Sequence, residues 1–451
     1  MPSLMSMPLP VTAPTSPRPK PVGARALTVP PQVRRDRPTE RLDPVAACAL
    51  LARAGQDGFW SAVEAVGTPL VDPVPGDERH RAVTFLWRGD GPGDVLVLAG
   101  KLADAASADR CRMARLPGTD IRALTYRLPS DWRGSYALAP IGAGAPPTVT
   151  GRDAELIGLR RARATAVADP ADRPALHRWF DALAVARPDP RAREHLPGGA
   201  SVASLPDAPP QPWNHPDPVV PAGAVLHGRL GSGHDAWLRH PPGAARDEPL
   251  PVLLVLDGER WSELGLPRTL DALQAAGRVP PLRAIGVASG DAATRTHALT
   301  CNDAFVTVLA EDALAWAATH GAVTADPART IVAGQSLGGL TAVYATCVAP
   351  QRFGCALAQS GSFWWPNPAG GAEPEWLTDL VAHTPPGSGT YLEVGTDEWV
   401  LREPTRRMCD ALRARGDTVT FREFSGGHDP ACWRGGLVDG LIALTAGWEQ
   451  A

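Results

Sequence analysis

The sequence feature that most constrains the fold is residues 334–339, Gly-Gln-Ser-Leu-Gly-Gly, which place a serine in the spacing Gly-x-Ser-x-Gly. A short apolar segment, residues 330–333, precedes this run, and an amphipathic segment starting at Leu340 follows it. This order predicts a strand, a tight turn and a helix, because the turn leaves no room for side chains at the glycine positions. Such a turn exposes the hydroxyl of Ser336 at the amino end of the helix, where free N–H groups and the helix dipole stabilise a developing negative charge. The run therefore predicts a nucleophilic serine on an α/β fold.

Strand and helix patterns alternate from about residue 222 onward. Alternation of this kind predicts a mainly parallel sheet with helices on both faces and a site at the carboxyl ends of the strands. The expected strands are residues 236–239, 251–256, 284–288, 330–333, 355–359, 391–394 and 418–424, and two of the expected helices are 303–319 and 404–415.

A chain of 451 residues is longer than one hydrophobic core usually serves, so we expect two domains. The amino-terminal half carries short strand patterns at regular spacing, separated by Gly, Pro and Asp, which predict a small β-sandwich. The first 40 residues are rich in Pro and Arg and poor in large apolar residues, a composition that does not bury enough surface to order itself. The predicted division is a disordered tail at 1–40, a β-sandwich domain at 41–200, a linker at 201–221 and an α/β domain at 222–451.

A serine hydroxyl needs a general base and an acid that orients this base. In folds with this strand–turn–helix motif the chain order is serine, then Asp or Glu, then histidine, each after a successive strand. His428 follows the last expected strand and stands after two glycines, so we expect it to be the base. This order predicts an α/β-hydrolase fold with a mainly parallel sheet, preceded by the smaller β-sandwich domain.

The acid of this triad is expected in the loop after residues 391–394. Glu398 and Asp397 both lie where that loop leaves the strand, and we favour Glu398 over Asp397. Glu393 is a third alternative, although it lies inside the strand and is expected to point along the sheet face. The position of the loop does not decide between these carboxylates.

Two backbone N–H groups are expected to form an oxyanion hole. One belongs to Leu337, directly after the serine. The other lies in the turn after the strand at 251–256, where Gly258 lets the backbone approach closely, so we expect Gly258 or Glu259 to supply it.

Composition excludes several classes of protein. The 44 Lys and Arg residues nearly balance 48 Asp and Glu residues, so the overall charge does not favour binding to nucleic acid or to a membrane surface. No apolar run is long enough to span a membrane, and no signal peptide is evident. Seven scattered cysteines without a Cys-x-x-Cys pair argue against disulfides or a zinc site and favour a reducing compartment, so we expect a cytoplasmic protein without metal or cofactor.

Several long motifs resemble the enterochelin esterase family of ferric siderophore hydrolases. The resemblance covers about residues 45–451. It leaves the choice between Asp397 and Glu398 open, because family members differ in the length of the acid-bearing loop. The motifs that carry the resemblance are residues 332–340, 352–355, 359–366 and 426–437 in the second half and residues 83–88 and 131–136 in the first half.

The resemblance implies an esterase that cleaves the ester bonds of a trilactone of dihydroxybenzoyl-serine units, usually after iron loading, in the cytoplasm. The substrate partner would be a ferric catecholate siderophore, and the sequence identifies no protein partner. Such a ligand is bulky, aromatic and anionic, so arginine and aromatic side chains beside the site are expected to bind it. The candidates are Arg434, Trp433, Trp364 and Trp365.

Two other functions fit the same sequence. One is an esterase of the same fold that acts on feruloyl or simple acyl esters. The other is a siderophore-binding protein without catalytic activity, which the presence of Ser336, His428 and an acid disfavours.

Overall fold

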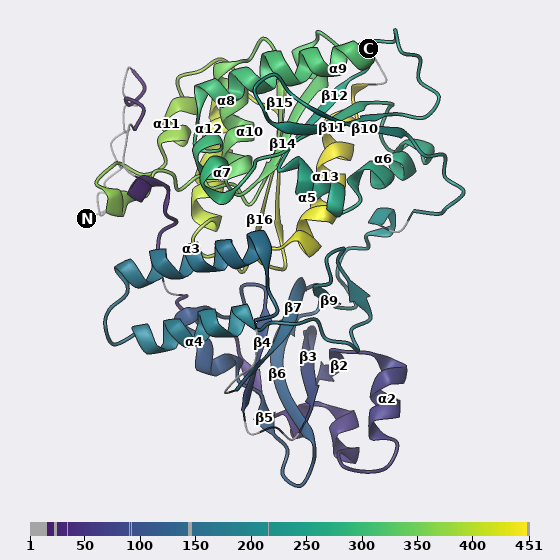
Figure 1. Cartoon of the computed structure of the whole chain (residues 1–451), viewed down its shortest axis with the longest axis vertical. Helices are drawn as coiled ribbons and strands as arrows, with labels where there is room; N and C mark the ends of the chain where they lie inside the picture. Colours follow the sequence, from purple (N-terminus) through teal and green to yellow (C-terminus); the bar gives the residue numbers. More distant parts are fainter. Residues whose placement is uncertain are drawn as a thin grey trace, which may run out of the picture.

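The computed structural model describes residues 16–21, 25–33, 35–89, 91, 93–142, 147–214 and 216–448. The chain forms an amino-terminal domain of two sheets and a larger carboxyl-terminal α/β domain (Figure 1). The predicted α/β fold with a mainly parallel sheet and an amino-terminal sheet domain is thus confirmed.

The carboxyl-terminal domain is built on one sheet of eight strands, in the order β10-β11-β13-β12-β14-β15-β16-β17. The first two pairings, β10 with β11 and β11 with β13, are antiparallel, and the others are parallel. The strands β12, β14 and β15 are buried along their whole length, as expected for parallel strands covered on both faces. The strands are β10 Ala224–Arg229, β11 Asp235–His240, β12 Val252–Leu256, β13 Arg283–Val287, β14 Thr330–Gln335, β15 Cys355–Gln359, β16 Gly389–Gly395 and β17 Val419–Phe424.

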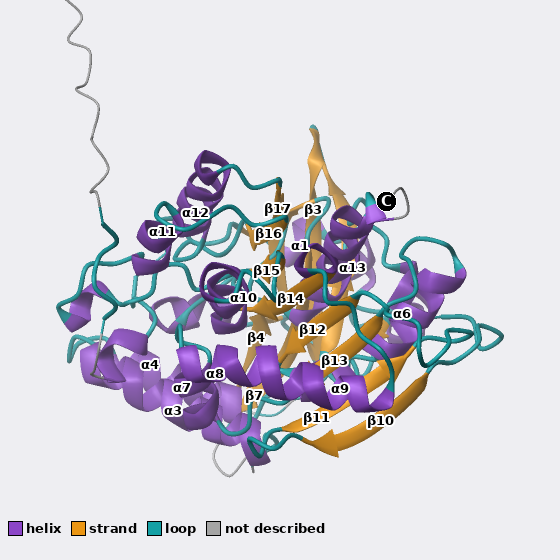
Figure 2. Cartoon of the chain, turned by 90° about the horizontal axis from the view of Figure 1, so that it is seen from above, coloured by secondary structure: helices purple, strands orange, loops and turns teal. Residues whose placement is uncertain are grey.

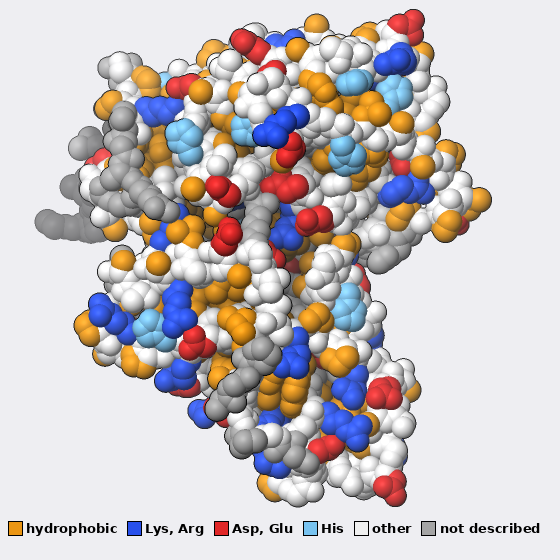
Figure 3. Space-filling view, viewed as in Figure 1, with side chains coloured by type: hydrophobic (Ala, Val, Ile, Leu, Met, Phe, Trp, Pro, Cys, Tyr) orange, Lys and Arg blue, Asp and Glu red, His pale blue; other side chains and the backbone are white. Residues whose placement is uncertain are grey.

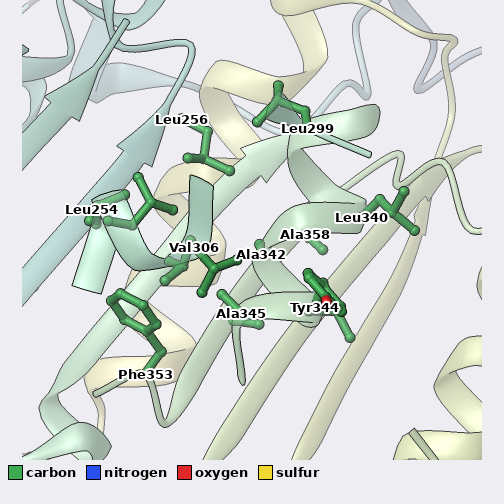
Figure 4. Close-up of a cluster of buried hydrophobic side chains, with 14 of the residues drawn as sticks. Leu254, Leu256, Leu299, Val306, Leu340, Ala342, Tyr344, Ala345, Phe353 and Ala358 are labelled. Atoms are coloured by element: carbon green, nitrogen blue, oxygen red, sulfur yellow. The ribbon is translucent and has the colours of Figure 1, made fainter. Parts of the chain in front are cut away.

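Helices cover both faces of this sheet, as Figure 2 shows from above. The cluster of buried side chains on one face includes Leu254, Leu340 and Phe353 (Figure 4), and a second cluster on the other face includes Leu270 and Leu437. The predicted helix at 303–319 is continuous but contains a π-helical turn in its middle. The helical segments are α5 Gly258–Glu263, α6 Leu266–Ala275, α7 Ala292–Ala298, α8 Asp303–Thr307, η5 Val308–Ala313, α9 Leu314–His320, η6 Pro327–Arg329, α10 Leu337–Val348, η7 Pro368–Gly370, α11 Trp376–Val381, α12 Arg402–Arg415 and α13 Pro430–Thr445.

The amino-terminal domain consists of two sheets that share one hydrophobic core. One sheet has the order β1-β6-β3-β2 with β5 on β6, and the other has the order β4-β7-β9-β8. Phe85 of the first sheet and Val97 and Tyr136 of the second lie in the same buried cluster. The elements are η1 Arg25–Thr28, β1 Arg41–Leu42, α1 Pro44–Ala47, η2 Ala49–Arg53, α2 Phe59–Val66, β2 Leu70–Val74, β3 Asp77–Arg88, β4 Asp94–Ala99, η3 Ala105–Cys111, β5 Ala114–Arg115, β6 Ile121–Pro129, β7 Arg133–Ile141, α3 Gly151–Val167, α4 Arg173–Ala184, β8 Glu194–His195, β9 Ser201–Ser204 and η4 Pro212–Asn214.

Two parts of this domain differ from the sequence-based expectations. The helices α3 and α4 were not predicted, and Figure 1 places α3 between the two domains. The strand β9 lies inside the range that we assigned to a linker, and it pairs with β7. The second sheet therefore continues to Ser204 before the chain crosses to the other domain.

The segment before residue 41 is bound to the carboxyl-terminal domain. Lys20 Nζ donates to the hydroxyl of Tyr344 at 2.8 Å, and the backbone N–H of Asn367 donates to the carbonyl of Leu27 at 2.8 Å. Leu27 itself is buried. The predicted disordered tail is therefore wrong for the described residues between 16 and 40, and its first fifteen residues lie outside the described ones. Composition alone misled us, because this segment is ordered by contacts with another domain rather than by its own core.

Basic and acidic side chains are interspersed over the face of the molecule shown in Figure 3. This distribution agrees with the nearly balanced composition.

Candidate active site

Three loops at the carboxyl edge of the large sheet bring the candidate residues together. Ser336 follows β14, Glu398 lies in the loop after β16, and His428 lies in the loop after β17. Because β14, β15, β16 and β17 are neighbours in this order and parallel, their carboxyl ends lie side by side. The loops after β16 and β17 are also joined directly, since the backbone N–H of Asp397 donates to the carbonyl of Gly426 at 2.9 Å.

Ser336 lies in the predicted sharp turn. Its backbone has φ 59° and ψ −119°, a strained conformation for a residue with a side chain. Its N–H donates to the carbonyl of Gln359 at 3.0 Å, which fixes the turn to the end of β15. A Cβ atom at Gly334 would lie only 2.4 Å from the carbonyl carbon of Gly338, so the turn requires glycine there.

His428 is oriented by Glu398. The distance from His428 Nδ1 to Glu398 Oε1 is 2.5 Å. The other carboxylate oxygen, Oε2, accepts hydrogen bonds from Ser360 Oγ at 2.6 Å and from the N–H of Gly395 at 2.7 Å. Glu398 is only 2% exposed. This geometry favours Glu398 as the acid, because its two oxygens have fixed donors and one of these is the imidazole.

The two alternative carboxylates have other partners. Asp397 Oδ1 accepts from Arg35 at 2.7 Å and its Oδ2 accepts from the indole N–H of Trp132 at 3.0 Å. Glu393 accepts a hydrogen bond from Gln359 at 2.6 Å, and burial raises the pKa of its carboxyl to about 7. Neither carboxylate forms a hydrogen bond with His428.

The hydroxyl of Ser336 lies 3.4 Å from Ser362 Oγ, and the structure shows no hydrogen bond from it to His428. A distance of 3.4 Å between two hydroxyl oxygens is long for a hydrogen bond, so little is lost when the side chain rotates. Hydrogen bonds between catalytic groups are often long in structures without substrate. The weak contact with Ser362 therefore does not hold the Ser336 hydroxyl firmly in this position.

The expected oxyanion hole lies where α5 and α10 begin. Leu337 is the first residue of α10 and Gly258 is the first residue of α5, so the N–H groups of both are among those that an α-helix leaves unpaired. A Cβ at Gly258 would lie 2.4 Å from the carbonyl carbon of Gly286, which explains the glycine. Glu259, the other expected donor, is the second residue of α5, and its carboxylate accepts from the N–H of Ser289 at 3.2 Å.

Arg295 was not identified from the sequence, although it contacts the turn between β12 and α5. Its guanidinium binds both carboxylate oxygens of Asp257 at 2.7 Å. Asp257 has a positive φ of 55°, so this ion pair fixes a strained residue next to Gly258. No local motif marks Arg295, because its partner is 38 residues away in the sequence.

The four predicted substrate contacts lie in different surroundings, and Trp433 lies beside His428 as expected. Trp364 and Trp365 are buried in the core of the carboxyl-terminal domain. Arg434 is also buried, and its guanidinium binds Glu194 of the amino-terminal domain and Gln211. Trp433 donates its indole N–H to Ser360 Oγ at 2.9 Å, and the centroids of its ring and the His428 ring are 4.7 Å apart. In this structure Trp433 supports the His428–Glu398 pair, and Arg434 joins the two domains.

Comparison with known proteins identifies the family. The family model described as "Enterochelin esterase, N-terminal" matches residues 82–214, and the model described as "Putative esterase" matches residues 229–444. The iron(III) enterobactin esterase of Dickeya dadantii is 35% identical over 434 residues, which cover 88% of this chain and 94% of that protein. The chain belongs to the enterochelin esterase family.

Solved structures of enterochelin esterases have the same two-domain fold. The ferric enterobactin esterase of Salmonella typhimurium gives a TM-score of 0.73 at 27% identity, covering 88% of this chain and all of that one. The enterobactin esterase of Shigella flexneri, solved in the presence of enterobactin, gives 0.69 at 27% identity and covers 88% of this chain and 99% of that one. The chain is therefore a carboxylic ester hydrolase of this family.

Two cationic side chains lie close to the acid loop. Lys101 of the amino-terminal domain places its Nζ 5.6 Å from the ring centroid of Trp399, and Arg35 lies over the same ring. Burial lowers the pKa of the Lys101 ammonium, while the nearby charge of Glu398 opposes this effect. Such groups favour anionic ligands.

Within the described residues no three His, Cys, Asp or Glu side chains gather as metal ligands, and no helix there has the length and hydropathy to cross a membrane.

Proposed function

We propose that the protein is a serine esterase that hydrolyses the ester bonds of ferric catecholate trilactone siderophores such as enterobactin, releasing iron. The observation that carries this proposal is the His428–Glu398 pair at the same sheet edge as the strained Ser336 turn, in a chain that matches iron(III) enterobactin esterases over most of its length. The presence of enterobactin in the Shigella flexneri structure supports the substrate class.

In the proposed reaction, Ser336 Oγ attacks the ester carbonyl carbon while His428 Nε2 accepts the hydroxyl proton. Glu398 accepts a hydrogen bond from His428 Nδ1 and stabilises the imidazolium that forms. The backbone N–H of Leu337, together with that of Gly258 or Glu259, stabilises the negative oxygen of the tetrahedral intermediate. The C–O bond of the substrate ester then breaks, His428 donates the proton to the departing oxygen of the substrate's serine unit, and the acyl group stays on Ser336. Water activated by His428 cleaves this acyl-enzyme in the second half of the reaction.

The charge near the site supports an anionic substrate. Arg35 and Lys101 lie near the loop that carries Glu398, and Arg295 binds Asp257 in the turn next to Gly258. A ferric tris-catecholate complex carries several negative charges and aromatic rings, so cationic and indole side chains such as Trp399 suit it.

We further propose that the reaction takes place in the cytoplasm. All seven cysteines are buried and unpaired, which fits a reducing compartment.

The test is hydrolysis of ferric enterobactin and of its iron-free form by the purified protein, with products separated by chromatography. We expect Ser336→Ala to lose at least about a thousandfold in rate, because only transition-state stabilisation without the nucleophile remains. The variant should still bind the ferric siderophore. Turnover close to that of the unchanged protein would exclude Ser336 as the nucleophile. Cleavage of simple acyl or feruloyl esters alone would instead identify a different esterase.

A further inference from the structure

The residues directly beside the candidate acid and base are bound by the amino-terminal domain. Asp397 precedes Glu398, and its Oδ2 accepts from the indole N–H of Trp132 at 3.0 Å. Asp429 follows His428, and its Oδ2 accepts from the backbone N–H of Ser135 at 2.6 Å and from the Ser135 hydroxyl at 2.8 Å. One short stretch of the amino-terminal domain, residues 132–135, thus contacts both catalytic loops. We refer to this stretch as the clasp.

Backbone contacts fix the clasp to the same region. The N–H of Arg133 donates to the carbonyl of Ser425 at 3.1 Å, three residues before His428. The carbonyl of Arg133 accepts from Cys432 Sγ at 3.2 Å, in the first turn of α13. The clasp is therefore attached on both sides of the base, and not only through side chains.

These contacts are buried, so breaking them is costly. Trp132 is 1% exposed and Asp429 is 2% exposed. A buried carboxylate without its donors carries a large desolvation penalty. Burial raises the pKa of both Asp397 and Asp429 above the usual range, and the donors from the clasp oppose this effect. The loops are consequently expected to rearrange when these donors are removed.

We propose that Trp132 and Ser135 are positioning residues for catalysis: through Asp397 and Asp429 they hold the acid loop and the base loop in the geometry that aligns Glu398 with His428. This inference rests on the proposed function of these two residues as members of the triad. It gives the amino-terminal domain a role in the chemical step itself. If the domain only formed a wall of the substrate pocket, changes in it would slow the hydrolysis of a large siderophore but not that of a small ester.

The test compares Trp132→Phe and Ser135→Ala, singly and together, with Trp60→Phe. Trp60 is a matched control, because its indole N–H donates to a carboxylate, Asp120 Oδ1, at 3.1 Å within the amino-terminal domain. The substrate is p-nitrophenyl acetate, which is too small to need a second domain as a wall. We expect the double variant to lose about 10- to 100-fold in kcat with KM within about twofold, since a misplacement of about 1 Å can cost about 100-fold. Trp60→Phe should keep the kcat of the unchanged protein.

A second measurement does not depend on turnover. The Nδ1–H group of His428 donates to the buried carboxylate of Glu398, so its proton is expected to give a far-downfield signal in the NMR spectrum. This signal should be lost or shifted in the double variant and kept in Trp60→Phe, at temperatures below the unfolding transition of each protein. An unshifted signal and an unchanged kcat in a folded double variant would overturn the proposal. An equal loss of kcat in Trp60→Phe would also overturn it, because the effect would then be one of general stability.

Failure of the clasp proposal can be distinguished from failure of the proposed function. If the protein cleaves p-nitrophenyl acetate through Ser336 but leaves ferric enterobactin intact, the proposed substrate is wrong and the clasp result still stands. If Ser336→Ala or Glu398→Gln cleaves the small ester at the rate of the unchanged protein, the triad is wrong and the clasp proposal falls with it.

Discussion

Replacing Glu398 by glutamine is predicted to stop catalysis through the tautomer of His428 rather than through lost packing. Glu398 Oε2 accepts hydrogen bonds from Ser360 Oγ and from the N–H of Gly395. An amide NH₂ group at this position would face the backbone donor of Gly395, so the amide oxygen must remain there. The NH₂ group of the glutamine then faces His428 Nδ1 and donates to it. His428 must in turn carry its proton on Nε2, where it can no longer accept the proton of Ser336.

The size of this effect follows from the role of the lost interaction. A change from carboxylate to amide at the same place in a Ser-His-Asp triad costs about 10⁴-fold in kcat. This factor corresponds to about 5.5 kcal/mol of transition-state free energy. We expect a loss of about 10³- to 10⁴-fold in kcat for Glu398→Gln, with little change in the folded structure because the two side chains have nearly the same shape.

The matched control is Asp397→Asn. Asp397 contacts Arg35 and Trp132, and an asparagine can keep an oxygen toward one of them. We expect a loss of about tenfold or less, because only one partly exposed ion pair is broken. The assay is kcat and KM on p-nitrophenyl acetate and on ferric enterobactin, together with the melting temperature of each variant. A larger loss in Asp397→Asn than in Glu398→Gln would refute the assignment of the acid.

Two further predictions concern buried charged groups. Burial raises the pKa of the Glu393 carboxyl from 4.5 to about 7. Its contribution to the free energy of unfolding is therefore fully present below about pH 4.5 and is lost as the pH rises to about 7, a change of about 3 kcal/mol. The melting temperature of the unchanged protein should therefore fall more between pH 5 and pH 8 than that of Glu393→Gln, and equal slopes would contradict this reasoning. Arg434→Met should lower the melting temperature by several degrees through loss of the contacts with Glu194 and Gln211. Its KM for ferric enterobactin should stay within about twofold, whereas a large rise in KM would restore Arg434 as a substrate contact.

Local sequence patterns predicted those parts of the fold that depend on interactions between residues close together in the sequence. Gly334 is required because a Cβ there would clash with Gly338, four residues away, and the alternating strands and helices follow from their own hydrophobic periods. The sequence could not decide between Asp397 and Glu398. Both carboxylates follow the same strand, and which of two adjacent loop side chains points toward His428 depends on the folded loop.

Residues whose partners lie far along the chain could not be placed from the sequence. Arg434 resembles a ligand contact when read beside His428, yet its partner Glu194 is 240 residues away. Trp132 and Asp397 are separated by 265 residues, so no local pattern indicates the clasp. The segment around Lys20 has the composition of a disordered tail, and contacts with the other domain, such as those of Lys20 with Tyr344 and Asp303, explain its order.

The binding of the first described residues to the carboxyl-terminal domain has a consequence for synthesis in the cell. The backbone N–H of Arg18 donates to Asp379 at 2.7 Å, across 361 positions of the sequence. At about 5–20 residues per second, roughly 20 to 70 s pass between the translation of these two residues. The amino-terminal domain is complete during this interval, while Arg18 and Lys20 still lack their partners Asp379 and Tyr344. These two residues are thus translated well before the surface on which they dock, so the nascent chain should be cleaved by proteases near Arg18 and Lys20 until the carboxyl-terminal domain has folded.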